Sequence, residues 1–251
     1  MMFFTFDTLH LRYDPFPIGV ARPLMAADTY AKLVESYPPL ELFQYFSKVG
    51  HKYVLSEKFN AENYDRFIRE NPLWRDFHAW IKSDDFSYGV MRMLREHGID
   101  LGYEAPTPPA KRLMKRAKAL AKRRTTQMEP NLKARFEFSM LPADGGSVTP
   151  HSDEPGKVVT LVISMLQDGE WDPAYGGGTD VNKPKDERRL FNRMNAKAPF
   201  EEMEILDSFP YEPNQAVIFV KTFNSWHSVR PMTGPEGMLR RTLTINIEAR
   251  G

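Results

Sequence analysis

The chain of 251 residues contains no cysteine. This absence excludes disulfide bonds, zinc sites built on thiolates and cysteine nucleophiles, and it is compatible with a reducing compartment. Opposite charges nearly cancel, leaving a formal net charge of +1, so the chain as a whole is neither a polycation nor an acidic tail. No apolar run approaches the roughly 18 residues that a membrane span requires. The first residues lack a basic segment, and Asp7 interrupts their apolar run, so we expect no signal peptide and a cytoplasmic protein.

The first part of the chain has the pattern of amphipathic helices. Asp28 is predicted to cap a helix whose apolar residues recur three and four positions apart as far as Tyr37. A second helix is predicted over 72–83. A third is predicted after Asp84, with Gly98 just beyond its end. The aromatic residues on these helices are expected to pack in the core.

From about residue 133 the pattern changes to that of strands. The predicted strands are 134–141, 157–166, 215–223 and 239–249, and 174–181 is predicted to be a Gly-rich turn that leads into a further strand. The polar segment 183–200 is expected to be a loop or short helix between two of them, and the acidic residues Glu201, Glu202, Glu204 and Asp207 are expected to lie in a solvated loop rather than a docking site. Helices outside a largely antiparallel sheet system give an α+β fold. We expect one domain over 1–251, in which 1–130 is mainly helical support with an opening strand and 131–251 carries the site.

A basic segment separates these two parts. Residues 111–124 hold eight lysines and arginines and no acid, with a helical apolar seam. Such a helix could lie on anionic lipid or contact a phosphate backbone. The alternative is a solvated surface helix docked by a thin apolar edge.

A histidine and an aspartate stand two residues apart at the start of a predicted strand. His151 and Asp153 in TPHSDEPG can direct their side chains to the same point, because alternate strand residues share a face. The pattern is common by chance, and a solvated turn is the alternative. A second histidine, His227, follows the strand 215–223. Two imidazoles and one carboxylate form the facial triad that binds Fe(II) and leaves open coordination positions, whereas a closed zinc site takes four protein ligands.

The strand 239–249 has one polar face and one largely apolar face. Arg240, Thr242, Thr244 and Asn246 alternate with residues that are apolar apart from Arg241. A polar face inside a barrel is costly unless it lines a ligand pocket. Arg240 would then offer a planar guanidinium to a carboxylate, and Thr244 a hydroxyl. The alternative is that Arg240 is an ordinary surface arginine.

The order and spacing of these motifs resemble the 2-oxoglutarate- and Fe(II)-dependent dioxygenases, in particular the prolyl-hydroxylase-like branch. The resemblance rests on His-Ser-Asp (151–153) followed by WDPAYGGGT (171–179), PNQAVIFV (213–220), WHSVRP (226–231) and RRTLTI (240–245), with a similar opening at 13–39. It implies a double-stranded β-helix, a jelly-roll barrel flanked by helices.

The resemblance also implies roles for these residues. His151, Asp153 and His227 would bind Fe(II), and 2-oxoglutarate would chelate the metal and pair its far carboxylate with Arg240. The expected reaction hydroxylates an aliphatic C–H bond of a small-molecule, peptidyl or sugar substrate and releases succinate and carbon dioxide. Ascorbate is a candidate reductant. Many relatives also place a tyrosine at the co-substrate carboxylate. Here the comparable positions are Leu141 and Val162–Met165, so Ser164 or Thr244 is a candidate replacement.

Two other functions are compatible with the sequence. A metal-binding barrel acting as a lyase, an isomerase or a sensor would need the same triad but not Arg240. A nucleic-acid or membrane adaptor would depend on 111–124 instead of the triad.

Overall fold

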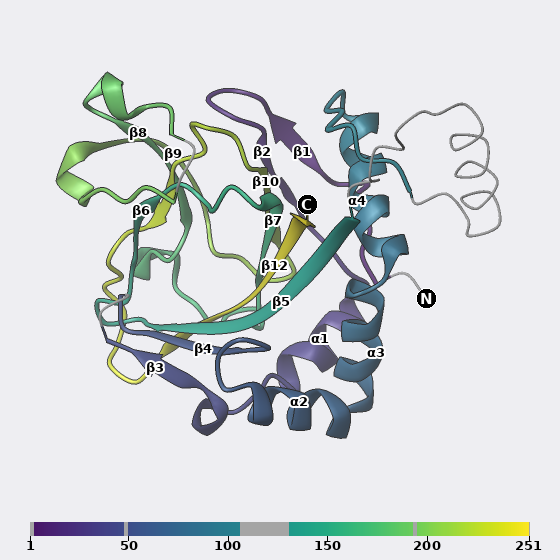
Figure 1. The fold of residues 1–251 in the computed structure, drawn as a ribbon. Coiled ribbons are helices and arrows are strands. Elements are labelled where there is room, and N and C mark those ends of the chain that lie inside the picture. Colours follow the sequence, from purple (N-terminus) through teal and green to yellow (C-terminus); the bar gives the residue numbers. More distant parts are fainter. Residues whose placement is uncertain (1–2, 48–49, 106–130, 193–194, 251) are drawn as a thin grey trace, which may run out of the picture.

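The computed structural model describes residues 3–47, 50–105, 131–192 and 195–250. Two antiparallel sheets form its framework (Figure 1). The larger sheet has the strand order β1 (His10–Arg12), β2 (Ile18–Ala21), β10 (Ala216–Val220), β7 (Lys157–Ser164), β12 (Leu239–Arg250), β5 (Asn131–Pro142), β4 (Lys52–Ser56) and β3 (Gln44–Phe46). The smaller sheet has the order β6 (Val148–His151), β11 (His227–Val229), β8 (Thr179–Pro184) and β9 (Met203–Phe209).

The last eight strands pass back and forth between the two sheets. β5, β7, β10 and β12 lie together in the larger sheet, and β6, β8, β9 and β11 make up the smaller one. All pairings between them are antiparallel. Two four-stranded sheets connected in this way form a double-stranded β-helix, a jelly-roll architecture. The predicted fold class is therefore confirmed.

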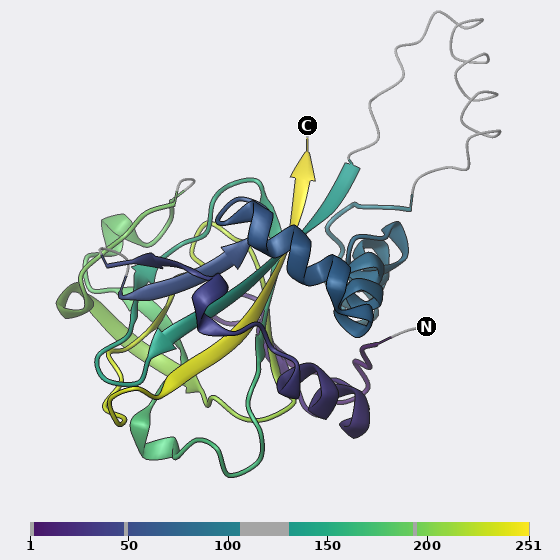
Figure 2. The ribbon, with the colours of Figure 1, turned by 90° about the horizontal axis from the view of Figure 1, so that it is seen from below.

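Within the described part of the chain, four helices cover the outer face of the larger sheet (Figure 2). They are α1 (Ala27–Glu35), α2 (Ala61–Glu70), α3 (Pro72–Ile81) and α4 (Asp84–Glu96). Phe136 and Phe138 of β5 point toward them, and the ring of Trp74 on α3 lies 4.9 Å from that of Phe138. Trp74, Phe136 and Phe138 are fully buried, so this aromatic cluster joins the helices to the sheet.

The opposite face of the same strands is polar. On β12, Leu243 and Ile245 belong to the core under the helices, while Thr242, Thr244 and Asn246 line a cavity between the two sheets. The alternation of the sequence 239–249 therefore separates the core from the cavity, since neighbouring strand residues point to opposite faces. The predicted polar face does line a pocket.

The helices differ from the predictions in several details. Ala26 occupies the N-cap of α1, and Asp28 lies in the first turn, where its carboxylate complements the helix dipole without capping. The helix predicted over 72–83 ends at Ile81, because Ser83 caps the next one by accepting a hydrogen bond from the amide of Phe86. Gly98 follows α4 with φ +76°, as predicted.

Several elements were not predicted. The helix α2 lies in a region to which the sequence analysis assigned no element, and strands β1 to β4 mean that the first part of the chain contributes more than an opening strand. The acidic segment around Glu204 and Asp207 forms the exposed strand β9 instead of a loop. The basic segment 111–124 lies outside the described residues. Within the described ranges, no helix has both the length and the apolar character needed to cross a membrane.

Candidate functional site

The two histidines of the predicted triad face each other across a pair of hydrogen-bonded strands. His151 ends β6 and His227 begins β11, and the antiparallel register pairs these two residues directly. Their ring centroids are 4.3 Å apart. Residues at adjacent strand positions of one sheet are held with little freedom, so the backbone itself fixes the separation of the two rings.

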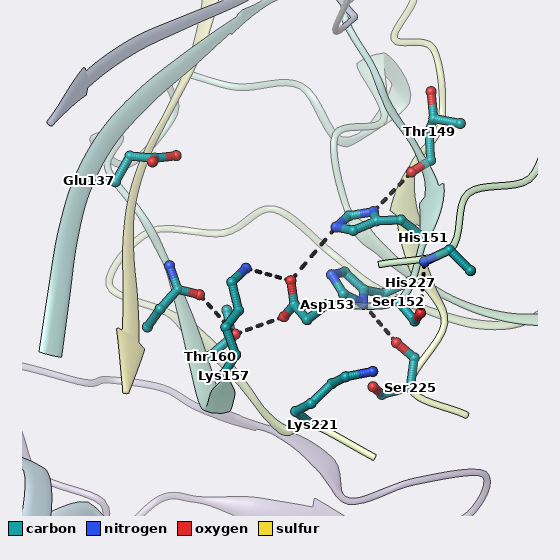
Figure 3. Close-up of polar contacts among 12 residues, drawn as sticks. Glu137, Thr149, His151, Ser152, Asp153, Lys157, Thr160, Lys221, Ser225 and His227 are labelled. Atoms are coloured by element: carbon teal, nitrogen blue, oxygen red, sulfur yellow. Dashed lines mark hydrogen bonds and ion pairs between the residues drawn. The ribbon is translucent and has the colours of Figure 1, made fainter. Parts of the chain in front are cut away.

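Backbone carbonyls select the tautomer of each ring. Nδ1 of His151 lies 2.9 Å from the carbonyl oxygen of Thr149, and Nδ1 of His227 lies 3.0 Å from that of Ser225 (Figure 3). A carbonyl can only accept, so each Nδ1 must carry the proton and each Nε2 keeps a free lone pair. This arrangement is typical of metal-ligating histidines.

Both rings are held neutral. Burial, followed by the neighbouring His227, lowers the pKa of His151 to about 3. Burial likewise lowers the pKa of His227, although Asp153 opposes the change. Two imidazoles that are neutral at pH 7 are available to coordinate a cation.

Asp153 supplies the third side chain. It is buried, and its Oδ1 lies 3.9 Å from Nε2 of His151. Burial alone raises the pKa of this carboxyl, but His227, Lys157 and His151 together outweigh it, so the pKa lies below its usual range. Asp153 is therefore ionised, and Nζ of Lys157 donates to Oδ1 over 2.5 Å.

A hydrogen-bonded chain orients this carboxylate. Oγ1 of Thr160 donates to Oδ2 of Asp153 over 2.9 Å and lies 3.0 Å from the atom of Asn246 that is assigned as Oδ1. Because a hydroxyl has one proton, both contacts are satisfied when Asn246 turns its NH₂ group toward Thr160. Asn246 then donates to Thr160, and Thr160 donates to Asp153. This chain leaves Oδ1 directed at the histidines.

The three side chains can hold a metal ion. One ligand atom from each of His151, Asp153 and His227 lies within 4.8 Å of the other two, and no other group of three such residues meets this criterion in the described part of the chain. Two nitrogens and one oxygen, with no sulfur, suit Fe(II) in an open facial site. The donor set and the free Nε2 lone pairs both fit that metal.

Arg240 lies in the same cavity and is 5% exposed. Its Nε donates to the carbonyl oxygen of Gly177 over 2.5 Å, and its guanidinium lies 4.7 Å from the ring centroid of Tyr211. Among the described residues, no aspartate or glutamate forms an ion pair with Arg240. Burial lowers the pKa of this guanidinium, yet arginine remains charged in proteins. A buried cation without an acidic partner is suited to an anionic ligand.

Gly177 permits this position of Arg240. Its φ is +84°, which is unfavourable for residues with a side chain. A Cβ atom there would lie 3.1 Å from Cδ of Arg240 and 3.1 Å from the sulfur of Met232. The Gly-Gly-Gly segment 176–178 therefore brings a backbone carbonyl close enough to fix the guanidinium.

The cavity between the sheets has a volume of about 140 Å³. The triad, Arg240 and Thr244 all line it, so the structure brings together every predicted site residue. Leu141 and Val162 also line it. Ser164 pairs directly with Thr242 of β12, so its side chain lies on the same face of the sheet as the residues that line the cavity.

Ion pairs occupy the wall formed by β4, β5 and the end of β12. Lys52 contacts Glu137 at 3.0 Å, and Nε of Arg135 lies 3.2 Å from Glu248. Lys52, Arg135 and Glu137 line the cavity. This wall is charged but internally balanced.

Other residues near the site were missed or play a different part. Lys157, Thr160 and Tyr211 were not predicted, although Lys157 stands four residues after Asp153 and alternation puts Thr160 on the polar face of β7. Arg230, which had no assigned role, forms a two-point ion pair with Asp180 at 3.0 and 3.2 Å and borders a separate cavity of about 450 Å³.

The sequence matches no protein-family model and no curated protein. Among solved structures, a prolyl-4-hydroxylase from Pseudomonas putida is similar over 93% of this chain and 92% of its own, with 14% identity and a TM-score of 0.48. A prolyl hydroxylase from Trichoplax adhaerens, solved with a peptide fragment of the hypoxia-inducible factor, is similar over 92% and 83%, with 9% identity and a TM-score of 0.45. EvdO2 from Micromonospora carbonacea, complexed with 2-oxoglutarate, is similar over 93% and 86%, with 11% identity and a TM-score of 0.46. At such identities, the function has to be argued from the site itself.

Proposed function

We propose that this protein is a 2-oxoglutarate- and Fe(II)-dependent dioxygenase that hydroxylates an aliphatic C–H bond. One observation carries the proposal. The neutral His151 and His227, the ionised Asp153 and the unpaired guanidinium of Arg240 line a single cavity between the two sheets. A metal site alone would explain the first three groups, whereas the buried cation requires an anionic ligand beside the metal.

In this proposal His151, Asp153 and His227 hold the iron, and Arg240 binds the far carboxylate of 2-oxoglutarate. Thr244, on the same face of β12 as Arg240, adds a hydroxyl to that carboxylate. When bound, the iron and the keto acid would activate dioxygen, which is the oxidant: one of its oxygen atoms would enter the substrate as a hydroxyl and the other would enter succinate, with release of carbon dioxide. Ascorbate is the candidate reductant.

The chain's own residues position these groups and limit water. The hydrogen bonds from Thr149 and Ser225 orient the rings, and the chain from Asn246 through Thr160 orients Asp153. Apolar side chains of Leu141, Val148, Val162, Val229 and Phe219 line the same cavity. Removing water from such a site strengthens the interactions of its charged groups.

Arg240 distinguishes this function from a metal-binding barrel of another kind. A lyase, an isomerase or a sensor that used only the triad would have no need for a buried guanidinium held by Gly177 and Tyr211. The adaptor hypothesis depends on 111–124, outside the described residues, and it gives no account of the cavity.

The test is conversion of 2-oxoglutarate to succinate without added substrate. We expect slow succinate release by the wild-type protein that requires both Fe(II) and oxygen. The variants His151→Ala and Asp153→Ala should release none above a heat-denatured control. An iron-loaded protein that neither binds nor consumes 2-oxoglutarate would remove the proposal.

A further inference from the structure

Two lysines stand on neighbouring chain segments close to the triad. Lys157 begins β7 and Lys221 follows β10, and these strands pair with Val220 opposite Val159. The amide of Lys221 donates to the carbonyl of Val158 over 2.9 Å, which fixes the two chain segments together. Figure 3 shows the ammonium group of Lys157 turned to Asp153 and that of Lys221 turned toward the segment with Ser225 and His227.

Neither lysine has an acidic partner of its own outside the triad. The ammonium group of Lys221 donates to the carbonyl of Thr222 over 2.9 Å, and no carboxylate in the described ranges forms an ion pair with it. Lys157 pairs with Asp153 alone. Burial lowers the pKa of Lys221, and only the charge of Asp153 opposes this. Both cations therefore depend on the one carboxylate that the metal would take.

The charges of the loaded site leave these two lysines unbalanced. Lys52 and Arg135 are paired with Glu137 and Glu248 on the opposite wall. In the proposed function, a divalent metal, Asp153, the dianionic keto acid and Arg240 together carry no net charge. Lys157, whose side chain is 14% exposed, and Lys221 then remain as two half-buried cations without counter-charge. An anion that approaches them would be attracted by both charges.

The size of the cavity indicates that the anion beside these lysines belongs to the substrate. A volume of about 140 Å³ is below the roughly 300–1,000 Å³ of typical small-molecule sites. A bound keto acid between the metal and Arg240 would occupy most of it. The substrate therefore has to present its reacting carbon from the edge of the cavity, where Lys157 lies and where Lys221 stands on the neighbouring chain segment.

We propose that Lys157 and Lys221 bind a carboxylate of the substrate, so that the protein hydroxylates an organic acid close to its carboxylate. This inference rests on the proposed function. A lysine ammonium group acts as a point charge and binds carboxylates and phosphates alike. Of these two anions the carboxylate is the one proposed, and a phosphate monoester is the alternative that the test distinguishes.

The test compares acids with their uncharged amides. The Fe(II)–2-oxoglutarate form of the protein is titrated anaerobically with a panel of N-acetyl amino acids, their matched primary amides and short alkyl phosphates. Binding is followed as a change in the visible absorption band of that form. We expect at least one acid to bind about tenfold more tightly than its amide, because a lost charge-assisted contact costs on the order of 1.4 kcal/mol.

Variants identify the residues responsible. Lys221→Met and Lys157→Met should each abolish most of the preference for acid over amide, while Lys32→Met, at an exposed position on α1, should keep it. Lys157→Met also removes a hydrogen bond to Asp153 and could disturb the metal site. Lys221→Met tests the role of the lysines without this effect, because the ammonium group of Lys221 donates only to a backbone carbonyl.

Each result decides the question. Three results would overturn the inference. No acid binds better than its amide, or alkyl phosphates bind better than the acids. The third result is a preference for acid over amide that persists in both lysine variants. Absence of the visible band itself would reject the proposed function, and this inference with it. A band without acid preference would reject the inference alone.

Discussion

His227 lies directly opposite His151 in the pairing of β11 with β6, and the two imidazole centroids are 4.3 Å apart. Residues 76 positions apart in the sequence thus become neighbours through strand register. A shift of one residue in this register would turn one ring to the other face of the sheet. The separation of the two rings is therefore a property of the fold, and Asp153 completes the group from the loop that follows β6.

Arg240 and Arg241 form a matched pair for testing the co-substrate site. Arg240 points into the cavity, whereas Arg241 points away from it and pairs with Glu170 at 2.5 Å. We expect Arg240→Met to weaken 2-oxoglutarate binding by about 10- to 100-fold, since hydrogen bonds to charged groups contribute about 1.5–3 kcal/mol. Arg241→Met should leave this affinity nearly unchanged. Isothermal titration with the iron-loaded protein measures both, and equal effects would contradict the assigned role.

Gly177 offers a second, independent approach to Arg240. An alanine there would adopt φ +84° and push against Cδ of Arg240, so Gly177→Ala should displace the guanidinium. We expect a weaker affinity for 2-oxoglutarate with little change in Fe(II) binding. Gly169→Ala is the control, because Gly169 also has a positive φ but has nothing near its Cβ position. An affinity unaffected by Gly177→Ala would show that this contact is dispensable.

The hydroxyl of Thr160 is expected to tune the metal site through Asp153. Thr160→Val removes the donor to Oδ2 while keeping the shape of the side chain. Loss of a partner that orients a metal ligand typically costs 10- to 100-fold in metal affinity, so about this decrease is expected for Fe(II). Competition with a chelator of known affinity measures it. Wild-type affinity in Thr160→Val would mean that Lys157 and the metal orient Asp153 without help.

The metal-free protein should lose stability as the pH falls. His151 has a pKa of about 3 in the folded chain, against an ordinary value of 6.5, so the unfolded chain binds a proton that the folded chain does not. Its contribution to stability is present above pH 6.5 and declines as the pH falls through this window toward 3. By pH 5 the loss from His151 alone is about 2 kcal/mol.

His227 and Asp153 act in the same direction, since the pKa of each is lowered on folding. Urea unfolding between pH 7 and pH 5 in the presence of a chelator measures the decline. The slope should be smaller in His151→Gln, which has no proton to gain. A slope identical in the two proteins would contradict a neutral, partly buried His151.

The sequence was most informative about strand 239–249 and about the metal-binding residues. The alternation along 239–249 predicted both a strand and a polar lining, and both are present, because side chains on a strand alternate between two faces. His151 and Asp153 were identifiable from their spacing and His227 from its place after a strand.

Other features depend on contacts that no local pattern records. Lys221 reaches the triad only because β10 pairs with β7, and Tyr211 lies under Arg240 only because the segment before β10 folds back. The strand β9 was read as a loop because its acidic residues are exposed at the edge of the smaller sheet, where burial imposes no apolar pattern. Asp28 has the residue type of a cap but stands two positions too late in the helix.

The most direct measurement is the visible absorption of the anaerobic protein with Fe(II) and 2-oxoglutarate. Coordination of the keto acid to ferrous iron gives a metal-to-ligand charge-transfer band. We expect this band in the wild-type protein, its absence in His151→Ala, and a higher 2-oxoglutarate requirement in Arg240→Met. Bound iron without the band in the wild-type protein, or a band that persists in His151→Ala, would contradict the account.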